Sequence, residues 1–464
     1  MLDLAIRHGT VVTAQASTRA DVGIQDGGVV ELGSVGAARD EIDATGLLVL
    51  PGGVDGHTHL EYQSATGAWS ADDFLSGTVA AACGGVTTVI DYARQQPGQS
   101  PADALAAWEQ MARSKAIVDY GFHLVPSEVD QALLDAVPRL IDDGFPTFKV
   151  FMTRVSDRPM LDLLAAVRAH GGLTMVHCEN PHIDEVARHR LEKDGRATAR
   201  AWGEARPQAS EYEATARAID YAEYTDSPIC IVHVSCARAL ERVRAGKARG
   251  APVRAETRPC YLLLTSDRYA EAPPRHLMYT GYPPLRETED LQALWAGVRD
   301  GTIDTVGSDH APWRLDQKAP GDQDVSLLPV GLPGIETQTR LIFSEGVSKG
   351  RITAERFVDV MSATPARLFG LYPRKGTIEV GSDADLVLLD RRREETVRYA
   401  DLHSRVGYEP CEGMASVGWP VMTLSRGEVV ARDGQPVATP GRGKLLRRPP
   451  FDLAAAFSAQ SRGP

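Results

Sequence analysis

The chain has 464 residues, and its 50 Lys and Arg against 62 Asp and Glu give a formal net charge of −12. This acidic balance disfavours a nucleic-acid or anionic-membrane surface, because both need a basic face that neutralises phosphate. No apolar run approaches the ~18 residues of a membrane span, and the N-terminus lacks the apolar core of a signal peptide. We therefore expect a cytoplasmic protein with no nucleic-acid or membrane partner.

Length and cysteine spacing set two further limits. The length fits roughly three domains of about 150 residues, although one α/β barrel can take up about 250 residues or more. The six cysteines are scattered and form no C-x-x-C pair. This spacing favours buried free thiols over a disulfide framework.

Both ends of the chain show the alternation of apolar and polar residues that is typical of β-strands. The N-terminal set lies within residues 1–50, and a second set with the same Gly-bearing turns lies within residues 373–440. Each set alone is too small to cover a sheet face. We therefore predict one small β-sandwich domain formed from N- and C-terminal segments.

The segment from residue 51 to residue 372 has a different pattern, in which short apolar runs alternate with amphipathic stretches such as residues 102–116 and 163–172. Eight alternating units predict an α/β fold, a (β/α)8 TIM-type barrel with its chemistry at the strand ends. We expect the tail, residues 441–464, to pack on a neighbour or to fray. The predicted strands cover residues 53–60, 87–92, 119–125, 147–151, 173–177, 229–234, 253–264 and 305–308.

Histidines end several of these strands. His57 and His59 are two residues apart, so in a strand both imidazoles project from the same face and can reach one metal ion. His177 and His233 end the fifth and sixth strands, and Asp309 ends the eighth. Any one of these histidines could be a hydrogen-bonded core residue. Their convergence at one barrel mouth predicts a site for zinc or another borderline divalent ion.

Lys149 lies in an otherwise apolar strand, TFKVF. A free ammonium buried there would be costly, so the side chain either points outward between helices or is chemically changed. Carbamylation by CO2 would turn its amine, with an ordinary pKa of about 10.4, into a carboxylate that is able to bridge two metal ions.

The order HxH, Lys, His, His, Asp on strands one, four, five, six and eight resembles that of the binuclear cyclic amidohydrolases, which include dihydropyrimidinase, hydantoinase, allantoinase and dihydroorotase. The resemblance covers nearly the whole chain and is closest to the dihydropyrimidinase/D-hydantoinase branch. The phrases that carry it include FKVFM, VHVSCA, ETRPCYLLL, VGSDHAP and GTIEVGSDADLVLLD.

The resemblance implies a role for each of these residues. Two divalent metal ions, for which zinc is favoured, would be bridged by N6-carboxylated Lys149 and a hydroxide. The hydroxide would attack a cyclic amide, and Asp309 would carry its proton to the leaving nitrogen. Asp309 is thus both a metal ligand and the catalytic residue. The implied ligands are His57, His59 and Asp309 for the more buried ion, and His177 and His233 for the more exposed one.

The expected substrate contacts differ from those of the hydantoinase branch. An Ala-Tyr pair that supplies an oxyanion donor is Thr153-Arg154 here, and the Ser of Ser-Pro-Pro is Tyr282. The Asn of an Asn-Gly loop is Val330, and the Cys of Cys-Pro-Gln/His-Tyr is Arg258. We take these positions as tentative substrate-binding residues. Arg154 could donate to the oxyanion, bind a substrate carboxylate or be an unrelated loop residue. A structural ion pair is favoured for Arg258, and Tyr282 could supply the missing hydroxyl.

Several alternative functions follow from the same residues. An allantoinase-like or imide-cleaving amidase, acting on a different and possibly anionic ring, is the nearest alternative. Dihydroorotase is disfavoured because Leu60, and not an arginine, follows His59. A non-enzymatic collapsin-response-like scaffold is disfavoured because every ligand position is filled. The family implies a small-molecule cyclic amide substrate and a homo-oligomer, either a tetramer or a dimer.

Overall fold

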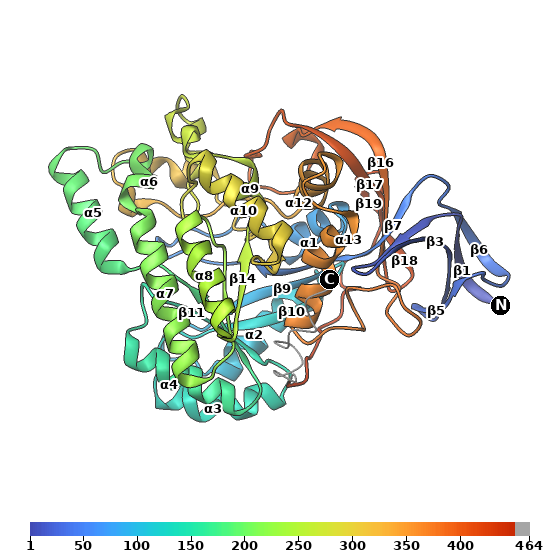
Figure 1. Cartoon of the computed structure of the whole chain (residues 1–464), viewed down its shortest axis with the longest axis horizontal. Coiled ribbons are helices and arrows are strands. Elements are labelled where there is room, and N and C mark those ends of the chain that lie inside the picture. The colour runs from blue at the N-terminus through green and yellow to red at the C-terminus, as the bar shows by residue number, and fades with distance from the viewer. Residues whose placement is uncertain (451–464) are drawn as a thin grey trace.

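Eight parallel strands form a barrel within residues 1–450, the part of the chain that this computed structural model describes (Figure 1). Each strand pairs with the next one along the chain, and a bridge between Thr58 and His310 lies at the seam between the first and the last. The strands are β8 (Gly53–Thr58), β9 (Val86–Arg94), β10 (Asp119–Val125), β11 (Thr147–Phe151), β12 (Leu173–His177), β13 (Ile229–Ile231), β14 (Val253–Thr257) and β15 (Thr305–Val306). They are buried almost throughout, because parallel strands in a barrel are covered on both faces. This is the predicted (β/α)8 barrel.

Four strands end earlier than the sequence pattern predicts: β8 and β15 by two residues each, and β13 and β14 by more. The seventh was expected to reach residue 264, but β14 ends at Thr257 and the helix α9 (Pro259–Leu263) follows. Pro259 cannot donate to a strand ladder, and its fixed φ suits the first turn of a helix. The sixth strand, β13, ends at Ile231, and His233 beyond it adopts a left-handed φ of 44°.

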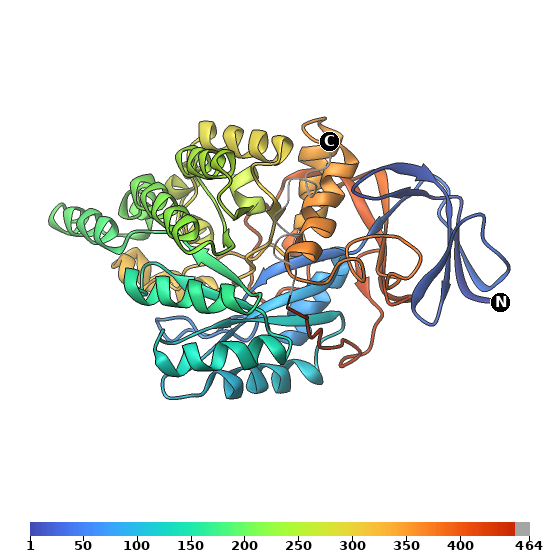
Figure 2. The ribbon, with the colours of Figure 1, turned by 60° about the horizontal axis from the view of Figure 1, so that its bottom comes forward.

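Helices surround the barrel strands (Figure 2). Both helices expected from amphipathic sequence are present as α2 (Pro101–Arg113) and α4 (Asp157–Ala169). No helix among residues 1–450 is long and apolar enough to cross a membrane. The remaining α-helices are α1 (Phe74–Cys83), α3 (Gln131–Asp142), α5 (Pro181–Lys193), α6 (Trp202–Ala205), α7 (Gln208–Thr225), α8 (Ala237–Arg249), α10 (Thr288–Asp300), α11 (Leu315–Lys318), α12 (Gln338–Ile342), α13 (Ala354–Val358) and α14 (Thr364–Leu368).

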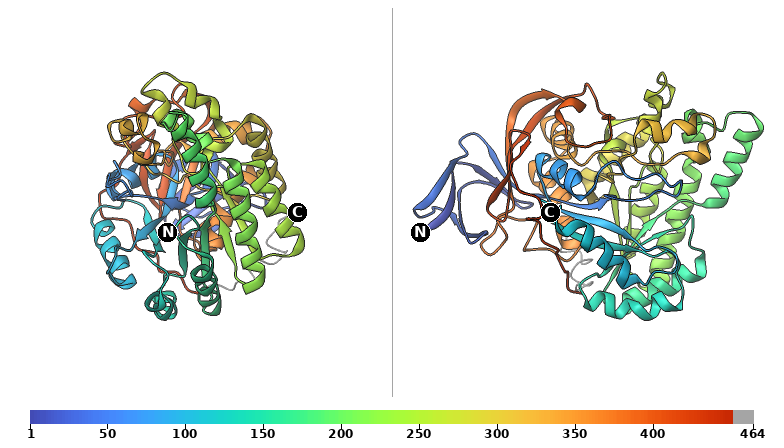
Figure 3. Two further views of the ribbon diagram at one scale, coloured as in Figure 1. Left: turned by 90° about the vertical axis from the view of Figure 1, so that its left-hand side faces the viewer. Right: turned by 180° about the vertical axis from the view of Figure 1, so that it is seen from behind.

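Strands from both chain ends form the sandwich at one end of the molecule (Figure 3). One sheet contains β5 (Gly28–Gly33), β4 (Asp21–Gln25), β1 (Leu2–Arg7) and β6 (Ala38–Asp43). The other contains β19 (Gln435–Pro436), β18 (Glu428–Arg432), β17 (Ala415–Ser425), β16 (Leu386–Thr396), β7 (Leu48–Pro51), β2 (Thr10–Val12) and β3 (Ser17–Arg19). The antiparallel pair β16 and β7 joins the two chain ends, and apolar side chains from both ends share one core. The predicted sandwich is therefore present, while the domain boundaries at residues 50, 372 and 440 stay predictions.

The segment 441–450 packs against the base of this chain's own barrel, where the sequence suggested a neighbour or a frayed end. The Leu446 N–H donates to the Tyr120 carbonyl at 2.7 Å, and the Arg448 N–H donates to the Gly144 carbonyl at 3.0 Å. Arg448 is fully buried and donates to the Phe122 carbonyl. The rest of the predicted tail, residues 451–464, lies outside the described residues.

Candidate metal centre and its cavity

The six predicted metal ligands meet at the carboxyl ends of the barrel strands. His57 lies within β8, Lys149 within β11, and His177 is the last residue of β12. His233 and Asp309 follow β13 and β15, both with a left-handed φ near 45°. Such a backbone is costly for residues other than glycine and is found where a structure holds functional side chains in place. The side chains of all six ligands are buried or nearly so: His57, His59, Lys149, His177, His233 and Asp309.

The distances between these side chains fit the ligands of metal ions. The Nε2 atoms of His57 and His59 each lie 3.1 Å from Asp309 Oδ1, and His177 Nδ1 lies 2.9 Å from His233 Nε2. Tetrahedral ligands bound to zinc at about 2.1 Å lie roughly 3.4 Å apart, which is close to these separations. One atom each from His57, His233 and Asp309 also fall within 4.8 Å of one another. The histidines and Asp309 can therefore hold metal in two adjacent groups.

Two of the histidines each contact a glutamate carboxylate through a ring nitrogen. His57 Nδ1 lies 2.5 Å from Glu256 Oε1, and His177 Nε2 lies 2.7 Å from Glu179 Oε2. A histidine that binds metal through one nitrogen typically donates its other N–H to a carboxylate, which fixes the tautomer. Glu256 and Glu179 complete this arrangement, although the sequence analysis did not select them.

Arg258 lies behind Asp309, one of the predicted metal ligands. Its Nη1 lies 3.0 Å from Asp309 Oδ2, and its side chain is almost fully buried. Burial alone would raise the pKa of Asp309, but the Arg258 guanidinium and His57 hold it well below its ordinary value. Asp309 is therefore an ionised acceptor. The Asp309 carboxylate is the ion-pair partner of Arg258. Arg258 does not line the cavity that is described below.

Lys149 faces the inside of the barrel, and its Nζ is buried without a hydrogen-bond partner among residues 1–450. The nearest aromatic rings are those of Tyr92, whose centroid is 4.8 Å away, and Phe151, at 5.2 Å. Burial lowers the pKa of the Lys149 ammonium to about 8. A lower pKa raises the fraction of neutral amine near pH 7, and the neutral amine is the form that reacts with CO2. The outward-pointing alternative does not describe this side chain.

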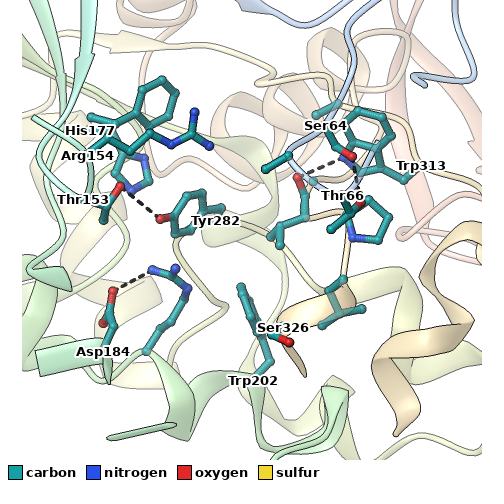
Figure 4. Close-up of a pocket in the computed structure, with 18 of the residues that line it drawn as sticks. Ser64, Thr66, Thr153, Arg154, His177, Asp184, Trp202, Tyr282, Trp313 and Ser326 are labelled. Atoms are coloured by element: carbon teal, nitrogen blue, oxygen red, sulfur yellow. Dashed lines mark hydrogen bonds and ion pairs between the residues drawn. The ribbon is translucent and has the colours of Figure 1, made fainter. Parts of the chain in front are cut away.

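A cavity of about 530 Å³ is lined by all six predicted metal ligands. This volume lies within the usual range for small-molecule sites. Tyr62, Trp202, Tyr282 and Trp313 supply aromatic walls, and Figure 4 shows Tyr282 between Thr153 and Trp202. Three of the four tentative substrate residues, Arg154, Tyr282 and Val330, line this cavity.

Tyr282 packs against His177, one of the predicted metal ligands. Its hydroxyl donates to Thr153 Oγ1 at 3.4 Å, and its ring centroid lies 4.2 Å from that of His177. Arg206 covers the Tyr282 ring at 4.0 Å. Burial raises the pKa of the Tyr282 hydroxyl, so it keeps its proton and can donate a hydrogen bond at neutral pH.

A buried lysine supports the loop that carries Val330. Lys318 Nζ donates to the Gly331 carbonyl at 2.6 Å and to the Thr280 carbonyl at 3.3 Å, and the Gly331 N–H donates to the Thr280 carbonyl at 3.0 Å. Lys318 is fully buried. It thereby ties together the two segments that present Val330 and Tyr282 to the cavity.

Comparisons with known proteins agree with the predicted resemblance. Residues 48–430 match the sequence profile of the Amidohydrolase family. A D-hydantoinase from Ralstonia pickettii is 39% identical over 454 residues, which cover 96% of this chain and 99% of that protein. A D-hydantoinase from Geobacillus stearothermophilus is 41% identical over 461 residues, covering 97% and 98%. The crystal structure of dihydropyrimidinase from Brevibacillus agri NCHU1002 has a TM-score of 0.95 and 38% identity, covering 97% of this chain and all of that one.

Proposed function

Because this chain belongs to the amidohydrolase family, we propose that it is a metal-dependent hydrolase that opens a cyclic amide of the hydantoin or dihydropyrimidine type. The observation that carries the proposal is the convergence of four histidines, Asp309 and an unpartnered buried lysine at the barrel mouth. The names of the similar proteins, D-hydantoinase and dihydropyrimidinase, support the substrate class.

The proposed centre holds two divalent ions, for which zinc is favoured by the imidazole-rich ligand set. Its ligands are His57, His59 and Asp309 for one ion, and His177 and His233 for the other, with N6-carboxylated Lys149 bridging them. The unsatisfied Nζ of Lys149 supports this assignment, since a buried donor without a partner is costly and a carbamate that binds metal removes that cost. When bound, such ions lower the pKa of a coordinated water and polarise a carbonyl.

Asp309 has the proton-transfer role in the proposed reaction. Its ionised carboxylate accepts a proton from the attacking water and delivers it to the ring nitrogen that leaves. Arg258 supports this role because its guanidinium, 3.0 Å from Oδ2, orients the carboxylate and keeps it ionised. The proposed substrate contact of Arg258 is thus replaced by a positioning role.

Tyr282 is the proposed hydrogen-bond donor to the substrate carbonyl. Its ring lies beside that of His177, and its hydroxyl keeps its proton and donates to Thr153. In the hydantoinase branch the tyrosine occupies the position of Arg154, one residue after Thr153. A hydroxyl donated from the opposite segment would restore the oxyanion donor that the Thr153-Arg154 pair lacks. The Val330-Gly331 backbone is the proposed contact with the ring amide.

The proposed function and its nearest alternative, an allantoinase-like or imide-cleaving amidase, differ in the ring that the enzyme hydrolyses. The test is a hydrolysis screen of dihydrouracil, hydantoins, allantoin and cyclic imides, with protein supplemented with zinc and bicarbonate. We expect ring opening of hydantoins or dihydrouracil, and loss of that activity in His177→Ala with the same purification. Hydrolysis of allantoin or imides alone would favour the alternative, and no hydrolysis together with no bound metal would favour a scaffold.

The proposal also includes a cytoplasmic location and a homo-oligomer, either a tetramer or a dimer. Cell fractionation and the solution mass of the purified protein test these two parts. Neither part affects the chemistry of the barrel mouth.

A further inference from the structure

We propose that the substrate ring carries a carboxylate on its substituent and that the Arg154 guanidinium binds this carboxylate. The inference rests on the proposed ring hydrolysis and adds the chemical class of the substituent. In this role Arg154 determines specificity and does not touch the bond that is broken.

Arg154 lies on the wall of the cavity that leads to the metal ligands. It follows β11, the strand that carries Lys149, and its backbone N–H donates to the Phe151 carbonyl at 2.9 Å. The guanidinium carbon lies 5.4 Å from the centroid of the Phe151 ring. In Figure 4 the guanidinium extends from the wall that holds His177 toward the middle of the cavity. Arg154 is exposed, and a substituent that reaches this part of the cavity would meet its cation.

The other two arginines of the cavity wall are already neutralised. Arg206 pairs with Glu179 at 3.1 Å and with Asp184 at 2.7 Å. Arg188 pairs with Glu192, one turn along the same helix. The charge of the largely buried Arg206 is compensated within the protein, and Arg188, in an exposed pair, already has the carboxylate partner that Arg154 lacks.

Arg154 differs from both because no carboxylate among residues 1–450 pairs with it. The remaining acidic residue of the lining is Glu185, which is exposed on α5 and forms no ion pair in the described part of the chain. A ligand that fills the cavity takes water away from the Arg154 guanidinium, and this loss is costly unless a hydrogen-bonding partner replaces the water. A carboxylate is the best replacement, since it accepts two parallel hydrogen bonds from a guanidinium.

The cavity has room for such a substituent. Its volume of about 530 Å³ exceeds what a single five- or six-membered ring needs. Aromatic side chains such as Tyr62 and Trp202 on its walls can cover a short apolar linker, because they offer large apolar surfaces. A short aliphatic acid on the ring therefore matches both the apolar walls and the free guanidinium.

The test compares two substrates that differ only in charge: a hydantoin with a carboxyethyl substituent and the same ring with the matching carboxamide. The readout is the ratio of kcat/KM for the acid to kcat/KM for the amide. In the wild type we expect a ratio of roughly 10- to 100-fold, the size of one charge-assisted hydrogen-bonded pair. Arg154→Gln should bring the ratio near one, and Arg154→Lys should keep part of it because lysine lacks the planar fork.

Glu185→Gln is the matched control, because it neutralises a charge that lines the same cavity without touching the proposed contact. We expect it to leave the ratio unchanged or to raise it. A wild-type ratio near one would overturn the inference. An equal loss on both substrates in Arg154→Gln would overturn it as well, because that pattern describes an oxyanion donor or a structural residue.

A binding measurement tests this inference even if the proposed hydrolysis is wrong. If the wild type opens neither ring, the proposed function fails, and calorimetry of both rings on the metal-loaded protein then decides the inference. Tighter binding of the acid than of the amide, lost in Arg154→Gln, supports the carboxylate contact. Equal binding of the two rings contradicts it.

Discussion

Lys149 is the residue whose chemistry depends most strongly on its surroundings. A lysine in water is a hydrated cation, whereas this one is buried beside Tyr92 and Phe151 with no acceptor in the described chain. Burial lowers its pKa to about 8, so the neutral amine is far more available near pH 7 than in an exposed lysine. The same burial that makes the ammonium costly therefore prepares the amine for carbamylation.

We predict that Lys149→Met separates stability from activity. Methionine has a similar length and removes a buried donor without a partner, so the metal-free variant should be as stable as the wild type or more stable by about 1–3 kcal/mol. Loss of a residue that supports a metal ligand typically lowers activity roughly 10- to 100-fold. Loss of the bridging residue itself should lower the rate of ring hydrolysis by more than that. Urea unfolding of the metal-free proteins and kcat/KM measure the two effects.

The control for this variant is Lys349→Met, which removes an exposed lysine paired with Glu345. It should change neither quantity appreciably, since exposed ion pairs contribute little. A Lys149→Met protein that keeps wild-type hydrolysis would contradict the bridging role of Lys149.

The shape of the cavity depends on two segments without regular secondary structure. One carries Tyr282 and the other carries Val330, and Lys318 joins them through its hydrogen bonds to the Thr280 and Gly331 carbonyls. Burial holds the pKa of Lys318 well below its ordinary value, and its fully buried amine holds backbone in place by donating to carbonyl oxygens. The position of the proposed donor Tyr282 therefore depends on a residue outside the cavity.

We predict that Lys318→Met loosens this wall. The substitution leaves buried carbonyl oxygens without donors, which costs about 1–3 kcal/mol for each group that water cannot reach. The free energy of unfolding should fall by about that amount, and KM should rise more than kcat falls because the reacting groups stay in place. Unchanged unfolding and unchanged KM would show that the two segments hold their positions without Lys318.

The element pattern could be predicted from sequence where burial dictated composition. Strands covered on both faces are apolar runs, so all eight barrel strands were visible, and so were the amphipathic helices α2 and α4. The ends of β13 and β14 were not predicted, because apolar residues continue past them into a left-handed turn at His233 and into the helix that Pro259 begins. Apolar composition reports burial and does not report which hydrogen bonds the backbone forms.

The same distinction applies to the site. The convergence of the histidines, Lys149 and Asp309 could be predicted because their places at the strand ends bring them to one barrel mouth. Glu256 was the most visible of the supporting residues, as an acid in a buried strand, yet its contact with His57 joins residues 199 positions apart. Lys318 is the last residue of the short helix α11, in a polar stretch of sequence, and looks like a surface lysine because its acceptors come from distant residues. Contacts of this kind require the folded chain.

A buried ion cluster joins the barrel to the sandwich. Lys375 Nζ lies 2.7 Å from Asp119 Oδ2 at the start of β10 and 2.7 Å from Asp385 Oδ2 just before β16. Arg426 adds a second cation beside Asp119. Burial alone would raise the pKa of Asp119, but Lys375 and Arg426 hold it below the ordinary value.

We predict that Asp119→Asn destabilises the protein at neutral pH and that the effect fades in acid. Breaking one contact of a buried ion cluster should cost about 3 kcal/mol, the lower end for such pairs, because Lys375 keeps two other carboxylates. A depressed pKa means that the folded state binds this proton less readily than the unfolded state. The contribution is therefore complete above the ordinary Asp pKa of about 3.9 and is lost as the pH falls below it.

Denaturant unfolding at about pH 7 and about pH 3 measures this difference for the wild type and the variant. Asp433→Asn, which removes an exposed partner of Arg393, is the control and should cost no more than about 1 kcal/mol. A difference between wild type and Asp119→Asn that persists unchanged in acid would show that the Asp119 charge does not stabilise the junction.

The central claim is that the residues at the barrel mouth bind two metal ions that are needed for ring hydrolysis. The most direct measurement titrates metal-free protein with Zn²⁺ in bicarbonate buffer while following the ring opening of a hydantoin or dihydrouracil. We expect no hydrolysis without metal and a rate that rises with bound metal until two ions are bound per chain. Hydrolysis by metal-free protein, or a rate independent of bound metal, would contradict the central claim.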